Sequence, residues 1–422
     1  MKILVYPHDL AIGGSQINAI ELAAAVSRLG HEVIVFGVPG PLVGRIRDLG
    51  LEFIASPQPR RRPSFAVLRA LTHVIREREI EVIHGYEWPP ALESYLVAAR
   101  MGARVSSVST VMSMAVAPFL PRTAPLLVGT EQIACVERSA GRHLIGVLEP
   151  PVDLDQNRLV DGQQTDDFRS RWQLDNDATV IVTVTRLAHE LKLEGLLTAI
   201  STIGELVSKG RPVQLVIVGA GPAGEEVARH ASVINQQHGD RTVVLTGELD
   251  DPRPAYAVAD IVLGMGGSVL RAMAFGKPVV VQGENGFWKA LNEDTVGQFR
   301  WTGWYGVGTG PSDGPRALLE ALTPLVDSET LRGSRGDYAR QIVEDYSLDI
   351  AAVAQLGAYV TATRNFPGRR RAFLEGVRVS VLYATFAVRE RWNRLRGRRV
   401  SDDFNSKPVA AKGVSRPEMS RS

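Results

Sequence analysis

Two cations stand close together in mid-chain, where they could bind a diphosphate. Arg186 and Lys192 follow an apolar run, Thr179–Thr185, that is typical of a buried strand. A guanidinium offers a rigid fork of donors and an ammonium offers a point charge. Cations at a helix start are unfavourable unless an anion joins them. The pattern predicts a phosphate site, and the alternative is a solvated helix start in which Glu190 pairs with either cation.

A glycine-rich turn supplies a second candidate for phosphate binding. The predicted strand Ile261–Leu263 runs into Gly264-Met265-Gly266-Gly267-Ser268 and then into a short helix. Backbone amides of Gly266, Gly267 and Ser268 could cradle a phosphate, and Arg271 lies one helical turn further on. A close-packed turn without a ligand is the alternative.

Gly13 and Gly14 form a similar turn after the first predicted strand, Lys2–Tyr6. Glycines let a ligand approach the backbone, and the amides of a helix start favour an anion or a sugar hydroxyl. A tight turn with no ligand remains open.

The stretch Gly219–Gly224 matches the G-x-G-x-x-G pattern of dinucleotide binding. It follows an interior strand of the second half, and the nearest acidic candidate, Glu248, lies beyond the next strand instead of at its end. An ordinary strand-to-helix turn is therefore favoured, with a dinucleotide-dependent oxidoreductase as the remote alternative.

Polar residues after two other strands suggest sugar or acceptor contacts. His84, Tyr86 and Glu87 follow one strand of the first half and are acceptor-side candidates, unless they pack at a helix start. Glu284 follows the strand Pro278–Val281, where its carboxylate could accept hydrogen bonds from sugar or ribose hydroxyls. A solvated loop acid is the alternative for Glu284.

Short apolar strands alternate with amphipathic helices through most of the 422 residues, which predicts two doubly wound α/β domains. We expect an N-terminal domain, a polar linker, a C-terminal domain, a basic amphipathic helix and a disordered tail, with the respective ranges 1–151, 152–167, 168–360, 361–400 and 401–422.

Composition narrows the class of protein. Cys135 is the only cysteine, so neither a disulfide framework nor a cysteine metal site is expected, and no metal or cofactor is invoked. The first residues read as a strand instead of a signal peptide, and no apolar run is long enough to span a bilayer, so a cytoplasmic protein is expected.

The net charge of +2 conceals a strongly basic C-terminal segment. From Arg364 onward the chain has 15 basic and 5 acidic residues. Apolar residues recur there at spacings of three or four: Phe373, Val377, Val381, Ala384, Val388, Trp392 and Leu395. This pattern fits a helix on an anionic membrane, at the inner face, and the alternative is a helix packed across the domains. Nucleic acid is not expected as a partner, because no binding module accompanies the charge.

Taken together, these motifs resemble the GT-B glycosyltransferases, specifically the retaining family 4 (glycosyl transferases group 1). The likeness covers residues 1 to about 360 and rests on these segments: Gly13-Gly14, Leu29–Val35, Pro151–Asp155, Thr185-Arg186-Leu187 with Lys192, Val216–Pro222 and Ala272–Val280.

The resemblance implies two Rossmann-like domains facing across a cleft and a hexosyltransferase that uses a nucleotide sugar as substrate. Its acceptor would be a glycan, lipid or small molecule. Arg186 and Lys192 would neutralise the leaving diphosphate, and Gly266–Ser268 and Gly13-Gly14 would border it.

Two family features are replaced. The usual pair of glutamates falls on Leu263 and Arg271, and the usual histidine falls near Ser109 or Thr110. These departures motivate the alternative of a catalytically degenerate relative that binds a nucleotide sugar or glycan.

Overall fold

The computed structural model describes residues 1–7, 9–158 and 161–396, and these form two compact units. The first unit comprises residues 1–151 and the chain from Leu348 onward, and the second comprises Val152–Ser347. The predicted tail at 401–422 lies outside the described residues.

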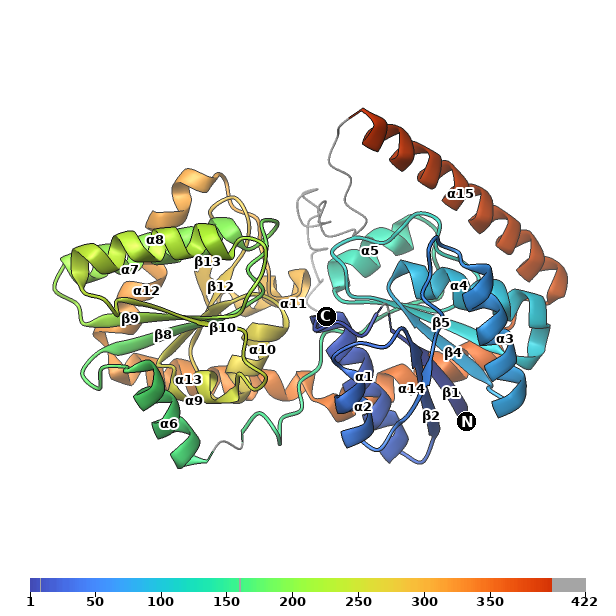
Figure 1. The fold of residues 1–422 in the computed structure, drawn as a ribbon, viewed down its shortest axis with the longest axis horizontal. Helices are drawn as coiled ribbons and strands as arrows, with labels where there is room; N and C mark the ends of the chain where they lie inside the picture. The colour runs from blue at the N-terminus through green and yellow to red at the C-terminus, as the bar shows by residue number, and fades with distance from the viewer. Residues whose placement is uncertain (8, 159–160, 397–422) are drawn as a thin grey trace, which may run out of the picture. The chain divides into compact units, whose positions relative to one another are not determined.

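The first unit is built on a parallel sheet with the strand order β3-β2-β1-β4-β5-β6-β7. Its strands are β1 (Lys2–Tyr6), β2 (Glu32–Gly37), β3 (Glu52–Ala55), β4 (Val82–Tyr86), β5 (Ser106–Val111), β6 (Leu126–Val128) and β7 (Ile145–Val147). Its helices are α1 (Gly14–Arg28), α2 (Val43–Asp48), α3 (Phe65–Arg78), α4 (Trp88–Met101), α5 (Glu131–Ser139), α14 (Leu348–Arg364) and α15 (Arg369–Leu395) (Figure 1).

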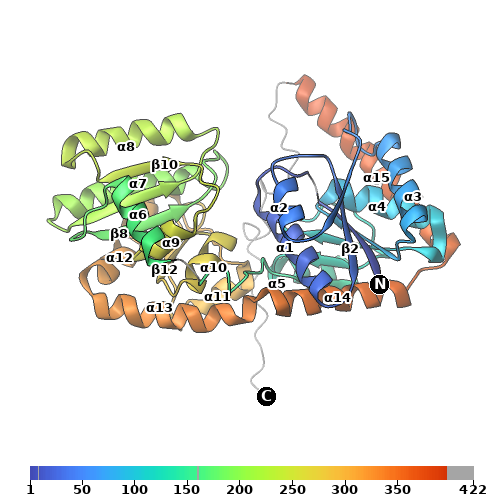
Figure 2. The same cartoon turned by 60° about the horizontal axis from the view of Figure 1, so that its bottom comes forward.

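Helices cover both faces of this sheet. Helices α1, α2 and α14 pack on one face, and α3 and α4 pack on the other. Figure 2 shows α14 running beside α1. Most of the strands are apolar, as expected for a sheet that is buried on both faces, and the buried serines and threonine of β5 are the exception.

The second unit has the strand order β10-β9-β8-β11-β12-β13, parallel except for the β12–β13 pair. Its strands are β8 (Thr179–Val184), β9 (Val213–Val218), β10 (Val243–Gly247), β11 (Ile261–Gly264), β12 (Val279–Gln282) and β13 (Trp288–Ala290). Its helices are α6 (Gly162–Trp172), α7 (Leu193–Ser208), α8 (Gly224–His238), α9 (Arg253–Val258), α10 (Gly267–Ala274), α11 (Val296–Thr302), α12 (Gly314–Asp327) and α13 (Glu329–Val343).

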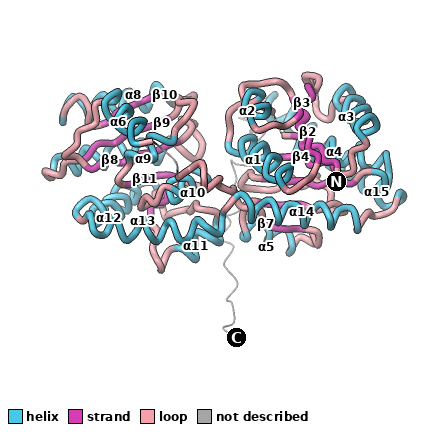
Figure 3. The backbone as a smooth tube through the Cα atoms, turned by 90° about the horizontal axis from the view of Figure 1, so that it is seen from below, coloured by secondary structure: helices cyan, strands magenta, loops and turns pink. Residues whose placement is uncertain are grey.

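Side-chain alternation in β8 shows how this sheet is sandwiched. Val180 and Val182 pack with α6, α9, α10 and α13, whereas Ile181 packs with α7, α8 and α12 on the opposite face. In Figure 3 the magenta strands lie inside the cyan helices. The predicted fold class, two α/β units with parallel sheets, is confirmed.

The unit boundaries differ from the predicted ones at two places. Residues 348–360 were expected in the second domain, but Ala352 and Tyr359 of α14 are fully buried in the first unit. Residues 152–167 were expected to be a linker, but Val152 is buried against the second unit, and Asp161 caps α6 through the Gln163 amide. Burial of Val152, Ala352 and Tyr359, which local polarity could not reveal, decides both assignments.

Candidate functional site

The loop that carries Arg186 leaves the carboxyl end of β8 and is held by the neighbouring turn after β9. The amide of Leu187 donates to the carbonyl of Ala220 (3.0 Å), and the amide of Ala223 donates back to the carbonyl of Leu187 (2.8 Å). The Arg186 side chain itself is exposed. A rigid backbone therefore presents an accessible guanidinium at this edge of the sheet.

The glycines of the Gly219–Gly224 fingerprint serve this packing. A Cβ on Gly219 would lie 1.9 Å from the carbonyl oxygen of Thr185, and a Cβ on Gly221 would lie 2.4 Å from that of Leu187. Gly219 also has a φ of 140°, which side chains rarely adopt. The close approach of two backbones thus explains these glycines without a dinucleotide.

Lys192 stands at the start of α7, where Gln282 of β12 fixes its backbone. The Gln282 side-chain amide donates to the carbonyls of Leu191 (3.3 Å) and Lys192 (3.4 Å). The Lys192 side chain is partly exposed, and the surrounding protein lowers its pKa to about 8 by desolvation. A partly desolvated ammonium at a helix start is unfavourable by itself, and an anionic ligand would offset that cost.

Glu194 joins this loop to the one after β12. Its carboxylate accepts hydrogen bonds from the amides of Asn285 (3.2 Å) and Gly286 (2.6 Å). Gly195 lies directly against Gln282, since a Cβ there would be 2.0 Å from the Gln282 side-chain nitrogen. Sequence reasoning missed Gln282 and Glu194; a polar residue ending the apolar strand β12 was the available signal.

The glycine-rich turn after β11 opens α10 as predicted. Gly266 has a φ of 56°, and its amide donates to the carbonyl of Trp304 (2.9 Å). The Ser268 hydroxyl donates to the carbonyl of Met265 (3.0 Å). The amides of Gly267 and Ser268 belong to the first turn of the helix, where backbone donors lack intrahelical acceptors. Their role in binding phosphate stays a prediction.

Arg271 and Leu263, the replaced glutamate positions, differ in their surroundings. Leu263 is only 1% exposed and packs in the core with α7 and α12. Arg271 is partly exposed. Burial raises the pKa of Tyr256 to about 12, and the positive charge of Arg271 acts against that increase. Arg271 therefore lies near α9, whereas Leu263 contributes only to packing.

Glu284 lies in the turn after β12, which pairs with the segment Trp304–Gly308. Its amide donates to the carbonyl of Gly306 (3.0 Å), and its carboxylate accepts the Tyr305 hydroxyl. Burial and the negative charge of Glu284 both raise the pKa of Tyr305. Glu284 is thus a fixed, half-buried carboxylate instead of a mobile loop acid, and Tyr305 is a neighbour that sequence reasoning missed.

Because β8, β11 and β12 are adjacent and parallel, their three following loops meet at one edge of the sheet. Lys192, Gly266–Ser268 and Glu284 belong to this edge, as does Arg186. Carboxyl edges of parallel sheets are where doubly wound proteins bind ligands. Cations, helix-start amides and a fixed carboxylate match a sugar linked to a diphosphate.

The first unit has its own polar cluster, centred on Glu87 at the end of β4. The Glu87 carboxylate accepts hydrogen bonds from the Ser15 hydroxyl (3.1 Å), the Met112 amide (2.9 Å) and the Ser113 hydroxyl (2.8 Å). Its backbone has φ 63° and ψ 171°, a region that is nearly restricted to glycine. Such strain is frequent at ligand-binding sites, so Glu87 remains a candidate on the acceptor side, where it would position the loops that bond to it.

Gly13 and Gly14 lie next to this cluster. Gly13 precedes α1, and its carbonyl accepts the Ile17 amide (3.0 Å). A Cβ on Gly14 would meet no atom within 4 Å, so a ligand could approach there.

His84 and Tyr86 need correction as acceptor-side candidates, because both are fully buried. His84 bonds Tyr359 of α14 through Nδ1 (2.8 Å) and Thr110 through Nε2 (2.7 Å). Tyr86 donates to Gln355 of α14 (2.9 Å). Burial lowers the pKa of His84 to about 3, so the ring is neutral. These two side chains attach α14 to the sheet, which local sequence could not reveal.

Comparison with known proteins agrees with this arrangement. A model of the family "Glycosyl transferases group 1" matches residues 178–328, and a "Glycosyl transferase 4-like domain" matches residues 13–144. The chain is 23% identical over 386 residues to a phosphatidyl-myo-inositol mannosyltransferase of Mycolicibacterium smegmatis, covering 85% of this chain and 93% of that protein.

Two solved structures share the fold. A glycosyltransferase from Rickettsia africae has a TM-score of 0.67 and 15% identity, over 86% of this chain and 99% of that one. The Anabaena protein HepE in complex with UDP has a TM-score of 0.63 and 15% identity, over 86% of this chain and 100% of that one. Two Rossmann-like units, each built on a parallel sheet, place the chain in the GT-B class. Within that class, the chain belongs to the family 4 glycosyltransferases (glycosyl transferases group 1).

Proposed function

We propose that this glycosyltransferase moves a hexose from a nucleotide sugar to an acceptor at a membrane, with retention of the anomeric configuration. The observation that carries the donor assignment is Lys192, a desolvated cation at the start of α7. Its loop follows β8, the strand next to β11, and the loop after β11 leads to the amides of Gly267 and Ser268. The relative HepE binds UDP, which supports a nucleoside diphosphate as the leaving group.

The chemistry follows from charge. As the bond between the sugar and the diphosphate breaks, negative charge grows on the leaving phosphate. Arg186 and Lys192 stabilise that charge, and the amides of Gly267 and Ser268 add fixed dipoles. Glu284, held by Tyr305, accepts hydrogen bonds from hydroxyls of the sugar or ribose. Arg271 remains a further candidate for an anionic donor.

The acceptor side belongs to the first unit, where Glu87 remains the acceptor-side candidate. Gly13 and Gly14 of the same unit border the diphosphate and the transferred sugar. The mycobacterial relative is named for a phosphatidyl-inositol acceptor, which supports an acceptor held in a lipid surface. Placement of the chain on the inner face of an anionic membrane is part of this proposal.

Calorimetric titration with UDP, GDP and ADP tests the donor site. We expect one of them to bind, and Lys192→Ala to weaken that binding about ten- to a hundredfold, the range for loss of a charged hydrogen bond. Lys209→Ala is the matched control, because Lys209 stands at the other end of α7 and pairs with Glu205 at the surface. Equal affinity in the Lys192→Ala variant and the native protein would exclude this site.

Retention is tested separately. NMR of the product formed from a sugar nucleotide of known anomeric configuration should show the same configuration in the new linkage. An inverted product would reject the retaining mechanism and leave the donor site intact.

A further inference from the structure

Helix α15 packs on the first unit with only one of its faces. Val379 is fully buried, and Tyr383 and Phe386 join an aromatic cluster with Trp88 and Phe119. The ring centroids of Phe119 and Phe386 are 5.1 Å apart, and those of Trp88 and Tyr383 are 5.6 Å apart. The helix is therefore a fixed part of this unit.

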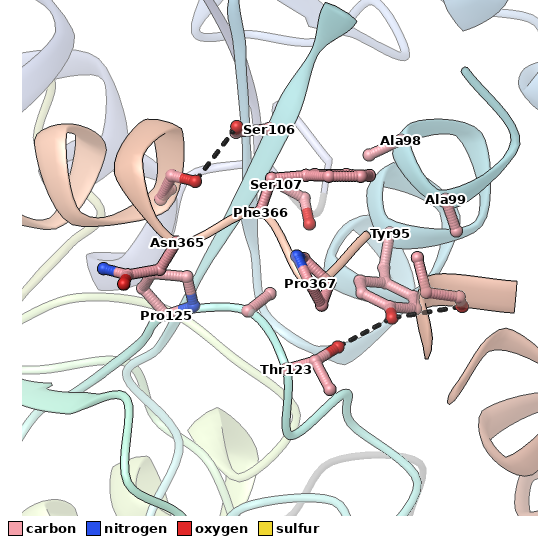
Figure 4. A pocket seen from close by; sticks show the side chains of 13 residues that line it. Tyr95, Ala98, Ala99, Ser106, Ser107, Thr123, Pro125, Asn365, Phe366 and Pro367 are labelled. Carbon is pink, nitrogen blue, oxygen red and sulfur yellow. Dashed lines mark hydrogen bonds between the residues drawn. The ribbon is translucent and has the colours of Figure 1, made fainter. Parts of the chain in front are cut away.

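Polar contacts anchor the beginning of α15. Glu375 accepts hydrogen bonds from the amide of Arg122 (2.6 Å) and from the side chain of Arg378 (2.6 Å). Tyr95 bonds Thr123 (2.8 Å) beside a cavity of about 20 Å³, where the chain passes from α14 to α15 (Figure 4). That volume holds about one water molecule, so this cavity is no ligand site.

The opposite face of α15 is apolar and exposed. Residues at spacings of three or four lie on one line along a helix, and this line is turned about half a revolution from Val379 and Phe386. We call it the outer stripe. Its large members are Phe373 (67% exposed), Val377 (47%), Val381 (57%), Val388 (69%), Trp392 (56%) and Leu395 (76%).

Arginines flank the outer stripe on both sides. Each residue along a helix is rotated by about 100° from the one before it. Arg389 follows Val388 and Arg391 precedes Trp392, so the two arginines lie on opposite sides of the outer stripe. Both side chains are exposed. From Arg369 to Leu395 the helix holds seven arginines and two glutamates.

We infer that the outer stripe is a docking surface for a bilayer that contains anionic phospholipid, with α15 lying flat in the headgroup region. Apolar side chains, an aromatic residue near the helix end and flanking cations are what such a surface requires. In the described part of the chain, no helix is long and apolar enough to cross a membrane, which agrees with a flat orientation.

The outer stripe could also contact the outer stripe of a second copy of this chain, and the charge of the flanking arginines favours the bilayer over such a dimer. Pairing two outer stripes would bring the arginines of both copies together, whereas anionic headgroups neutralise them. The inference rests on the membrane placement proposed above and assigns it to one helix face of the acceptor-side unit.

Vesicle flotation of the full chain tests this surface. We expect binding to vesicles of phosphatidylcholine mixed with phosphatidylglycerol, and little binding to phosphatidylcholine alone. The double variant Val381→Asp/Val388→Asp should bind at least about tenfold more weakly, because two charges would have to enter the apolar boundary. Arg389→Gln/Arg391→Gln should bind about thirtyfold more weakly, from about 1 kcal/mol for each cation.

A matched control tests whether replacing any exposed helical valine by aspartate weakens vesicle binding, even outside the outer stripe. Val233→Asp changes a helical valine of similar exposure, 53%, in α8 of the second unit, and should bind vesicles like the native chain. Tryptophan emission should shift to the blue when mixed vesicles are added, and Trp392→Phe should remove most of that shift.

The outcomes separate this inference from the proposed function. Native-like vesicle binding by the Val381→Asp/Val388→Asp variant would overturn the docking surface and leave membrane placement standing. If the native chain bound no vesicles, the docking surface and the membrane placement would both be overturned. Sugar transfer to a soluble acceptor is a separate measurement, and neither vesicle result would decide it. A dimer in sedimentation velocity that the double variant dissociates would assign the stripe to a second copy instead.

Discussion

At the scale of single residues, Lys192 is the centre of the proposed donor site. Its ammonium has lost much of its hydration, and its pKa falls from 10.5 to about 8. Without a ligand, the protonated form is therefore less stable here than in water. A diphosphate that binds beside it would restore the charged form and gain affinity from doing so.

The lowered pKa predicts how donor binding depends on pH. The unliganded protein loses the Lys192 proton as the pH rises through about 8, so the affinity for the nucleoside diphosphate should fall above that pH. The decrease should approach tenfold per pH unit until the pKa of the complex is reached. Calorimetry between neutral and alkaline pH measures this slope.

Lys192→Arg is the control for the pH dependence, because a guanidinium stays charged throughout this range. Its affinity should be nearly independent of pH, even if it is weaker overall. The same slope in this variant and the native protein would show that another group titrates.

At the scale of elements, the loops at the carboxyl edge of the second unit are positioned by backbone contacts between neighbouring turns. The turn after β9 supports the loop of Arg186, and the turn after β12 supports that of Lys192. Sequence reasoning identified the cations and the glycine-rich turns. For Gly219 it favoured an ordinary strand-to-helix turn over a dinucleotide site, but it could not give the reason, which is the close approach of the Thr185 carbonyl.

Gly219→Ala tests this support. Its Cβ would collide with the Thr185 carbonyl, and the positive φ adds strain, so the free energy of unfolding should fall by about 1–3 kcal/mol. Affinity for the nucleoside diphosphate should fall as well, because the Arg186 loop must move. Urea unfolding and calorimetry measure the two effects.

Gly224→Ala is a control within the same motif. There the nearest atom to a new Cβ is the Leu187 side chain at 3.8 Å, and the position lies at the start of α8. Stability should stay the same or rise slightly, since alanine favours helix. Equal destabilisation by both substitutions would contradict the packing explanation.

At the scale of the whole molecule, the chain leaves the first unit once and returns to it. Val152 and Ser347 form a β-bridge where the second unit begins and ends, so its two ends lie side by side. The second unit is therefore continuous in sequence, whereas the first needs α14 to cover its sheet.

This topology predicts which pieces fold alone. Residues 152–347 should unfold in one cooperative transition and bind the nucleoside diphosphate. Residues 1–151 should not fold cooperatively, because His84 and Tyr86 would lose their partners on α14. Circular dichroism during urea unfolding measures both.

A chain that joins residues 1–151 to 348–422 by a short glycine-serine linker is the control. It restores α14, and the neighbouring positions of Val152 and Ser347 show that a short connection is enough. It should fold, and cooperative folding of residues 1–151 alone would contradict the role given to α14.

The sequence by itself determined the fold class, the break near residue 151 and the donor-side candidates. These depend on local features: strand and helix periodicity, glycines in turns, and cations that follow strands. Arg186, Lys192, Gly266–Ser268 and Glu284 could be singled out because each follows a strand of one parallel sheet, and such strand ends share an edge.

Only the tertiary structure decided which polar residues are internal and which apolar residues face outward. His84 reads as a candidate ligand-binding residue until α14, from the far end of the chain, buries it. Trp392 and its stripe read equally as core or surface until the aromatic cluster occupies the other face of α15. Burial depends on contacts between residues distant in sequence, and local periodicity does not contain that information.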